Sequence, residues 1–280
     1  MDSFSEVVDP SQFHWSDAGW TGIDLSSCVI YELHVGTFSA EGTFAGVVHH
    51  LDHLVGVGVG AVELMPIAER PGRRGWGYDG VDLFAPFHHY GSPTELAFLV
   101  DRCHEVGLGV ILDVVYNHLG PHGNYLGQFG PYFTDRVKTP WGQAVNLDGP
   151  DSDEVRAFFI DNALCWLEDF HLDGLRLDAV HALFDTSARP FLAELSAAVD
   201  HLSNRSGHRR VVIAESDLND PRLVDPEDRG GCGLTATWSD DFHHCVHAYL
   251  TGESFGYYQD FGQAEQLLSA LESPYVCLLY

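Results

Sequence analysis

The sequence predicts an α/β protein whose fold is a (β/α)8 TIM barrel, incomplete at about six βα units, with an irregular insertion after the third strand. Short apolar runs alternate with amphipathic helices about six times along the 280 residues, which is typical of βαβ units and a parallel sheet. The turn after the first run, VGTFSAEGTF, lacks the GxGxxG spacing of an open dinucleotide-binding sheet. Polar residues follow several runs, and a barrel brings such strand ends together at one mouth. They are His34, Asp113 with Asn117 and His118, Arg176 with Asp178, and Glu215.

Six apolar runs predict the strands, at residues 29–35, 61–67, 109–115, within 172–181, 210–214 and, more weakly, 235–238. The run GVILDVV at 109–115 is apolar almost throughout, as expected of a strand that is covered on both faces. A closed barrel needs eight strands, so six leave two open edges. The sequence also ends on the apolar run SPYVCLLY, and we expect it to be part of a longer protein.

Apolar residues at helical spacing predict the helices between these strands. They cover residues 43–54, 94–106, 152–170, 190–202, 242–250 and 264–271. Residues 117–150 are rich in glycine, proline and aromatic residues, and a loop of that length inside a domain is usually functional. Residues 1–28 are irregular, and we interpret them as a packed tail or as a linker from an upstream domain, which leaves 29–280 as the barrel domain.

Composition limits the possible partners. A net charge of −27, from 41 acidic and 14 basic residues, argues against nucleic acid and anionic membranes. Six cysteines without a CxxC pair predict reduced thiols rather than a disulfide framework. The N-terminus lacks a secretory signal pattern and no apolar run reaches transmembrane length, so we expect a cytoplasmic protein without a membrane partner. The histidine pairs are adjacent residues rather than spaced ligands, and we expect no metal and no cofactor.

Two carboxylates at the ends of neighbouring predicted strands, Asp178 and Glu215, indicate glycoside hydrolysis, which places a carboxyl group on each side of one bond. Arg176 and Asp178 lie two residues apart in a strand and therefore share a face, so Arg176 would keep Asp178 ionised. Glu215, if it is held in a drier position, would keep its proton and donate it to the leaving oxygen. A structural ion pair is an equal alternative for Arg176 and Asp178 taken alone.

Aromatic side chains in the loops could stack on sugar rings, although such residues more often serve in packing. They are Trp76, Tyr78, Tyr125, Tyr132 and Trp141.

Three stretches resemble the first three signature regions of the α-amylase superfamily, glycoside hydrolase family 13. They are DVVYNH at 113–118, GLRLDAVH at 174–181 and AESD at 214–217, in the family's order and at the expected strand ends. Within the superfamily, ELMPIAERPGRRGWGYDGVDLFAP and WSDDFHHCVHAYLTGESFGYYQDF resemble the maltooligosyltrehalose trehalohydrolases. The glycogen branching enzymes share the early part of this pattern.

The resemblance implies a role for each matching residue. Asp178 corresponds to the catalytic nucleophile, Glu215 to the general acid/base, and Arg176 to the residue that orients the nucleophile. The implied substrate-binding residues are Tyr78, Asp113, His118, Arg176 and His181, whereas Asn117 could equally be a structural residue of its loop.

The implied activity is retaining hydrolysis of the α-1,4-glucosidic bond next to the terminal trehalose of a maltooligosyltrehalose, with an α-glucan as the partner. A branching transferase and a catalytically inactive fragment are the alternatives. The family's fourth signature region, with its third carboxylate, and its upstream β-sandwich have no counterpart in this sequence. We therefore expect the chain to be inactive when isolated.

Overall fold

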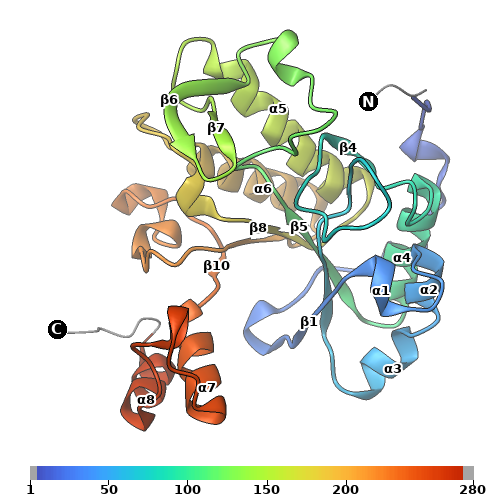
Figure 1. Ribbon diagram of the computed structural model, residues 1–280. Helices are drawn as coiled ribbons and strands as arrows, with labels where there is room; N and C mark the ends of the chain where they lie inside the picture. The colour runs from blue at the N-terminus through green and yellow to red at the C-terminus, as the bar shows by residue number, and fades with distance from the viewer. Residues whose placement is uncertain (1–4, 274–280) are drawn as a thin grey trace.

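The computed structural model describes residues 5–273 and contains a six-stranded parallel sheet in the order β1-β2-β5-β8-β9-β10 (Figure 1). The strands are β1 (Ile30–Leu33), β2 (Ala61–Leu64), β5 (Gly109–Val114), β8 (Gly174–Leu177), β9 (Val211–Ala214) and β10 (Ala236–Thr237). Each strand pairs in parallel with the next one along the chain, so the sheet is an arc of a (β/α) barrel with β1 and β10 at its edges. All six predicted strands are confirmed. The terminal apolar run, from residue 274 on, lies outside the described residues.

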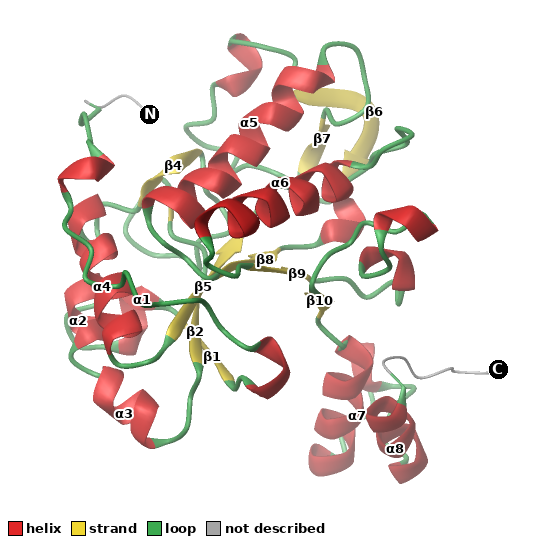
Figure 2. Cartoon of the chain, turned by 180° about the vertical axis from the view of Figure 1, so that it is seen from behind, coloured by secondary structure: helices red, strands yellow, loops and turns green. Residues whose placement is uncertain are grey.

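Helices connect the strands and cover one side of the sheet (Figures 1 and 2). The α-helices are α1 (Val35–Phe38), α2 (Phe44–Val48), α3 (Leu51–Gly56), α4 (Pro93–Glu105), α5 (Ser152–Leu164), α6 (Phe191–Ser206), α7 (Asp240–Thr251) and α8 (Ala264–Glu272). Short 3₁₀ turns occupy Pro10–Gln12, Leu25–Ser27, Leu126–Gln128, Val180–Ala182, Pro221–Leu223, Glu227–Arg229 and Gly256–Tyr258. Helices α7 and α8 pack on each other beyond β10. Within residues 5–273, none of these helices is both long and apolar enough to cross a bilayer.

Two helix predictions need correction. The single helix expected at 43–54 is wrong, because the chain leaves helical geometry at His50 (φ −112°, ψ 3°) and forms α2 and α3 instead. The helix expected at 152–170 ends as α5 at Leu164 and continues as a π-helical turn, Cys165–Asp169. Helix α4 begins with a capping box in which Ser92 and Glu95 satisfy each other's backbone N–H groups, so this helix starts where the sequence predicted.

Two antiparallel hairpins interrupt the βα pattern. The first joins β3 (Ala68–Glu69) to β4 (Asp82–Pro86), and the second joins β6 (Phe133–Thr139) to β7 (Gly142–Val145). The expectation that residues 117–150 are irregular is therefore wrong in part. A signal was present in FTDRVKTPWGQAV, where threonines and valines flank a Pro-Trp-Gly turn, because such residues favour strands around a tight turn.

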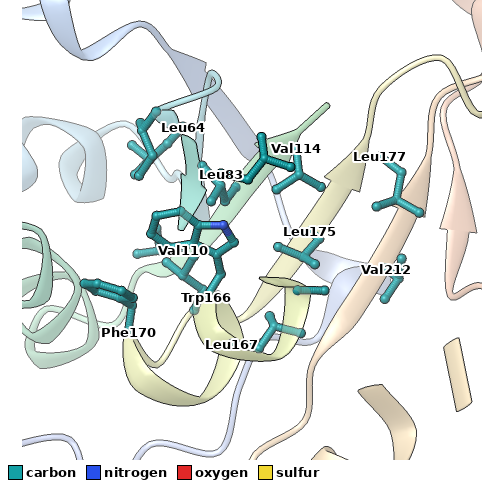
Figure 3. Packing of buried hydrophobic residues seen from close by; sticks show 14 of the residues in the cluster. Leu64, Leu83, Val110, Val114, Trp166, Leu167, Phe170, Leu175, Leu177 and Val212 are labelled. Carbon is teal, nitrogen blue, oxygen red and sulfur yellow. The ribbon is translucent and has the colours of Figure 1, made fainter. Parts of the chain in front are cut away.

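The central strands β2, β5, β8 and β9 are buried on both sides, whereas the edge strands β1 and β10 are partly exposed. Alternate residues such as Val62, Leu112 and Leu175 pack against the helices, and Figure 3 shows the Trp166 indole lying among such strand side chains. The intervening residues face the inner side of the arc, where Ile111 and Ile213 form a separate apolar cluster. Glu63, Asp113 and Arg176 alternate with the helix-facing set, because the side-chain period of a strand is two residues, so they also face the inner side.

The N-terminal segment packs against the end of the arc at which the strands begin. The Trp20 indole donates to Asp173, which directly precedes β8, at 2.6 Å. Asp173 is fully buried and also accepts from Nε2 of His104 at 3.0 Å and Nε2 of His208 at 2.9 Å. The other ring nitrogen of His104 lies 2.8 Å from Asp17. This network is at the opposite end from the strand C-termini and therefore stabilises the fold rather than lining the mouth.

No disulfide links the cysteines among residues 5–273, which are Cys28, Cys103, Cys165, Cys232 and Cys245.

Candidate active site

Three carboxylates gather around one guanidinium at the C-terminal end of the sheet. Nη1 of Arg176 donates to Asp113 Oδ1 and to Asp178 Oδ1, both at 2.8 Å. Nη2 of the same guanidinium lies 3.7 Å from Glu215 Oε2. The in-register pairing of Asp113 with Arg176, on β5 and β8, places the first two side chains next to each other. Asp178 and Glu215 therefore face a common space at the mouth of the arc.

Arg176 stays cationic in this position. Burial alone would lower the pKa of Arg176, but the charges and hydrogen bonds of Asp113 and the charge of Asp178 outweigh that effect and raise it. The guanidinium offers several N–H donors in one plane, so Arg176 fixes the positions of the carboxylates that it binds.

Asp113 connects this cluster to the glycine-rich loop at 70–80. Burial raises the pKa of Asp113 to about 7, while Arg176 and the Tyr78 hydroxyl act in the opposite direction. The Tyr78 hydroxyl donates to Asp113 Oδ2 at 2.7 Å. Burial and the nearby Asp113 raise the pKa of Tyr78, so the phenol keeps its proton and remains a donor.

Asn117 holds Asp178 directly. Its amide nitrogen donates to the backbone oxygen of Asp178 and to Asp178 Oδ2, both at 2.8 Å. With Arg176 on Oδ1, both carboxylate oxygens of Asp178 have a donor. The sequence left Asn117 open between a loop residue and a site residue, and the structure places it in contact with Asp178 in the site.

Glu215 occupies a wetter position than Asp178. Its side chain is 24% exposed, against 13% for Asp178, so the structure without substrate does not place Glu215 in the drier of the two positions. Its Oε2 accepts from the backbone N–H of Ala179 at 2.6 Å. Ala179 has a left-handed backbone (φ 42°), a conformation that is costly for a residue with a Cβ and that aims this N–H at Glu215.

His118 lies under an aromatic cover. Its Nε2 donates to the carbonyl oxygen of Tyr78 at 3.0 Å, and its Nδ1 faces the Asn117 side chain. Trp141, at the turn of the β6–β7 hairpin, stacks on the imidazole with ring centroids 4.9 Å apart. Burial lowers the pKa of His118. The predicted sugar contact of His118 remains a prediction, since both of its nitrogens face protein groups here.

The remaining candidate residues lie either next to the carboxylate cluster or away from it. His181 lies in the 3₁₀ turn after Asp178, with Nδ1 3.6 Å from Asp217 Oδ1, next to the carboxylate cluster along the chain. His34, which the sequence grouped with the strand ends, contacts the Gly75 carbonyl and the Tyr90 hydroxyl instead. Trp76 and Tyr125 are exposed on their loops.

Among residues 5–273, one set of side chains has the spacing of a metal site, namely Glu32, Glu63 and Asp113, whose oxygens lie within 4.8 Å of one another. Both oxygens of Asp113 already accept from Arg176, so a bound cation would compete with a guanidinium. Glu63 is only 3% exposed, and its Oε2 has no hydrogen-bond partner in the part of the chain that the structure describes. Burial and the nearby Asp113 raise the pKa of Glu63 to about 8, which favours the protonated carboxyl.

Comparison with known proteins gives consistent relatives. A family model described as alpha amylase, catalytic domain, matches residues 8–131. A malto-oligosyltrehalose trehalohydrolase from Arthrobacter ramosus is 54% identical over 94% of this chain and 46% of its own length. One from Saccharolobus solfataricus is 48% identical over 98% of this chain and 47% of its length.

A crystal structure of a putative alpha amylase from Salmonella typhimurium superposes with a TM-score of 0.86 at 41% identity, covering 95% of this chain and 45% of that one. The chain thus spans about half the length of the relatives that it matches.

Proposed function

Because this chain belongs to the alpha-amylase family, we propose that its site hydrolyses the α-1,4-glucosidic bond next to the terminal trehalose of a maltooligosyltrehalose and releases trehalose. The observation that carries the proposal is the placement of Asp178 and Glu215 around the single guanidinium of Arg176. Glycoside hydrolysis requires such a pair of carboxyl groups facing one bond. The trehalose-specific part rests on the similarity to the trehalohydrolases.

In the first step, an oxygen of Asp178 attacks the anomeric carbon while Glu215 protonates the glycosidic oxygen, which leaves with its sugar. Arg176 and Asn117 hold the two Asp178 oxygens and orient the nucleophile towards the sugar. In the second step, Glu215 removes a proton from water, which attacks the anomeric carbon and frees Asp178. Configuration at the anomeric carbon is retained, because two inversions follow each other.

Glu215 is open to solvent before a substrate binds. Its side chain is 24% exposed, and its Oε2 accepts from the backbone N–H of Ala179. A sugar bound across the mouth would exclude water from Glu215.

The test uses the whole protein that contains this chain and a trehalose-capped maltooligosaccharide. We expect Asp178→Asn and Glu215→Gln each to reduce trehalose release by roughly ten-thousandfold, the effect of removing a group that acts at the reacting bond. Asp52→Asn, a change of the same kind at an exposed position on α3, should leave the rate unchanged. Near-normal turnover in either site variant would rule out the assigned roles.

Product analysis separates the activities. Free trehalose is the expected result, together with a malto-oligosaccharide whose new reducing end has the retained α configuration, followed by NMR. New α-1,6 branches formed from amylose without trehalose would indicate a branching transferase instead. An acidic protein acting on a neutral, soluble glucan is compatible with the cytoplasm, which we propose as its location.

A further inference from the structure

A buried arginine lies at the base of the glycine-rich loop that leads to Tyr78. Arg70 directly follows β3 and is 3% exposed, whereas residues 71–76 of the loop are exposed. Nη1 of Arg70 donates to the carbonyl oxygen of Arg74 and Nη2 to that of Gly75, both at 3.0 Å. The guanidinium thus reaches across its own loop and binds the backbone on the far side.

No carboxylate among residues 5–273 forms a salt bridge with this cation. The adjacent Glu69 is occupied by His88, whose Nδ1 lies 2.9 Å from Glu69 Oε2. The guanidinium also donates to the Tyr90 hydroxyl at 3.2 Å and lies over the rings of Phe87 and Tyr90, whose centroids are 4.0 and 5.9 Å from the guanidinium carbon. Burial of an unpaired charge is costly, so the two loop carbonyls and the aromatic face are what make this burial possible.

A second group binds the same point of the loop. The Gly75 carbonyl oxygen also lies 3.0 Å from Nε2 of His34, and because a carbonyl can only accept, this nitrogen carries the proton. Gly75 has a φ of 137°, and a Cβ at this position would lie 3.1 Å from Nη1 of Arg70. The backbone at Gly75 therefore fits closely against the guanidinium, and a larger residue would disturb it.

The anchored backbone continues directly into the site. Gly77 has a φ of 103°, and a Cβ there would lie 2.0 Å from the Pro66 carbonyl oxygen, so the loop passes closely over the end of the β2 segment. The next residue is Tyr78, whose hydroxyl donates to Asp113 and whose carbonyl accepts from His118. The position of Gly75 therefore restricts where the Tyr78 ring can lie.

We propose that Arg70 is a positioning residue, which fixes the loop at 71–77 through the Arg74 and Gly75 carbonyls so that Tyr78 faces Asp113 and the sugar at the mouth. The catalytic part of this inference rests on the proposed function. Arg70 touches no reacting group, and it acts through Tyr78. The buried guanidinium has its two carbonyl acceptors only while the loop keeps this conformation, so burial of Arg70 and order in the loop are coupled.

The first experiment needs no enzymatic activity. Chymotrypsin cleavage after the exposed Trp76 is followed by mass spectrometry in the unmodified chain and in three variants. Arg70→Met keeps the apolar stem and removes the donors. We expect at least about tenfold faster cleavage, which is the fold-change for losing one of its charge-assisted hydrogen bonds. Arg70→Lys should restore part of the protection, because an ammonium group still donates. Arg73→Met, an exposed arginine of the same loop, should cleave at the original rate.

The second experiment is a double-mutant cycle with Tyr78→Ala in the whole protein, measured as kcat/KM for the trehalose-capped oligosaccharide. Arg70→Met should lower kcat/KM about tenfold when Tyr78 is present, and cause no further loss when it is absent. Additive losses, or unchanged cleavage after Trp76 in Arg70→Met, would overturn the proposal. If the unsubstituted protein releases no trehalose, the proposed function fails, and the same cycle is measured on malto-oligosaccharide affinity together with the cleavage rates.

Discussion

Replacement of Glu63 by glutamine should stabilise the protein near pH 8 and have little effect at pH 4. The Glu63 carboxyl is buried on the inner side of β2 with Oε2 unpartnered, and burial and Asp113 raise its pKa to about 8. In the unfolded chain, a glutamate titrates near 4.5. Between these values the folded state holds a proton that the unfolded state releases, so the stability of the unsubstituted protein falls as the pH rises. A glutamine has no proton to lose and avoids this fall.

The magnitude follows from the two pKa values. Their difference is about 8 − 4.5 = 3.5, which at about 1.36 kcal/mol per unit gives an upper limit of about 5 kcal/mol at pH 8. At pH 6, which is about 1.5 pH units above the pKa of the unfolded carboxyl, the upper limit of the difference is about 2 kcal/mol. The amide of glutamine fits the same volume, so packing contributes little to the difference.

Urea unfolding of the chain, followed by tryptophan fluorescence at pH 4, 6, 7 and 8, measures this difference. Titrating groups that do not interact with Glu63 contribute equally to both proteins and cancel in the comparison. Glu32→Gln, the exposed in-register neighbour of Glu63 on β1, is the matched control and should show a much smaller change with pH. A difference between Glu63→Gln and the unsubstituted protein that stays constant from pH 4 to 8 would refute the protonated, buried state of Glu63.

Two further changes test other parts of the molecule. Asn117→Ala removes both hydrogen bonds from the Asn117 amide to Asp178 and leaves the one from Arg176. Because hydrogen bonds to charged groups contribute roughly 1.5–3 kcal/mol, we expect kcat to fall about 10- to 100-fold. A kcat within twofold of the original would contradict this role. His104→Gln should lower the free energy of unfolding, measured by urea denaturation, by about 3–5 kcal/mol, because it breaks a buried charged network. Burial alone would lower the pKa of His104, but Asp173 and Asp17 outweigh burial and raise that pKa. The stability that His104 provides should therefore be lost as the pH rises through the raised pKa. If His104→Gln lost stability over the same alkaline range, His104 would be excluded as the cause of the decline.

Local patterns in the sequence were sufficient for the order of the elements and for the composition of the mouth. Each strand is a short apolar run, and each main helix has its own apolar stripe, so neighbouring residues carry that information. Parallel strands of a βα repeat end at the same edge, which is why Asp113, Arg176, Asp178 and Glu215 could be grouped before their positions were known. Where patterns were short or mixed, as in the two hairpins and at His49–His50, the same reasoning failed.

The sequence by itself therefore determined the αβ repeat, the parallel sheet and the residues that line its C-terminal mouth. Only the tertiary structure decided that Asn117 holds Asp178, that Glu215 is the wetter of the two carboxyl groups, that Glu63 is buried without a partner at Oε2, and that Arg70 anchors the loop before Tyr78. The reason is physical. The environment of a polar side chain depends on which groups from distant parts of the chain exclude water from it and donate to it, and Asn117 meets Asp178 across 61 residues of sequence that no local pattern connects.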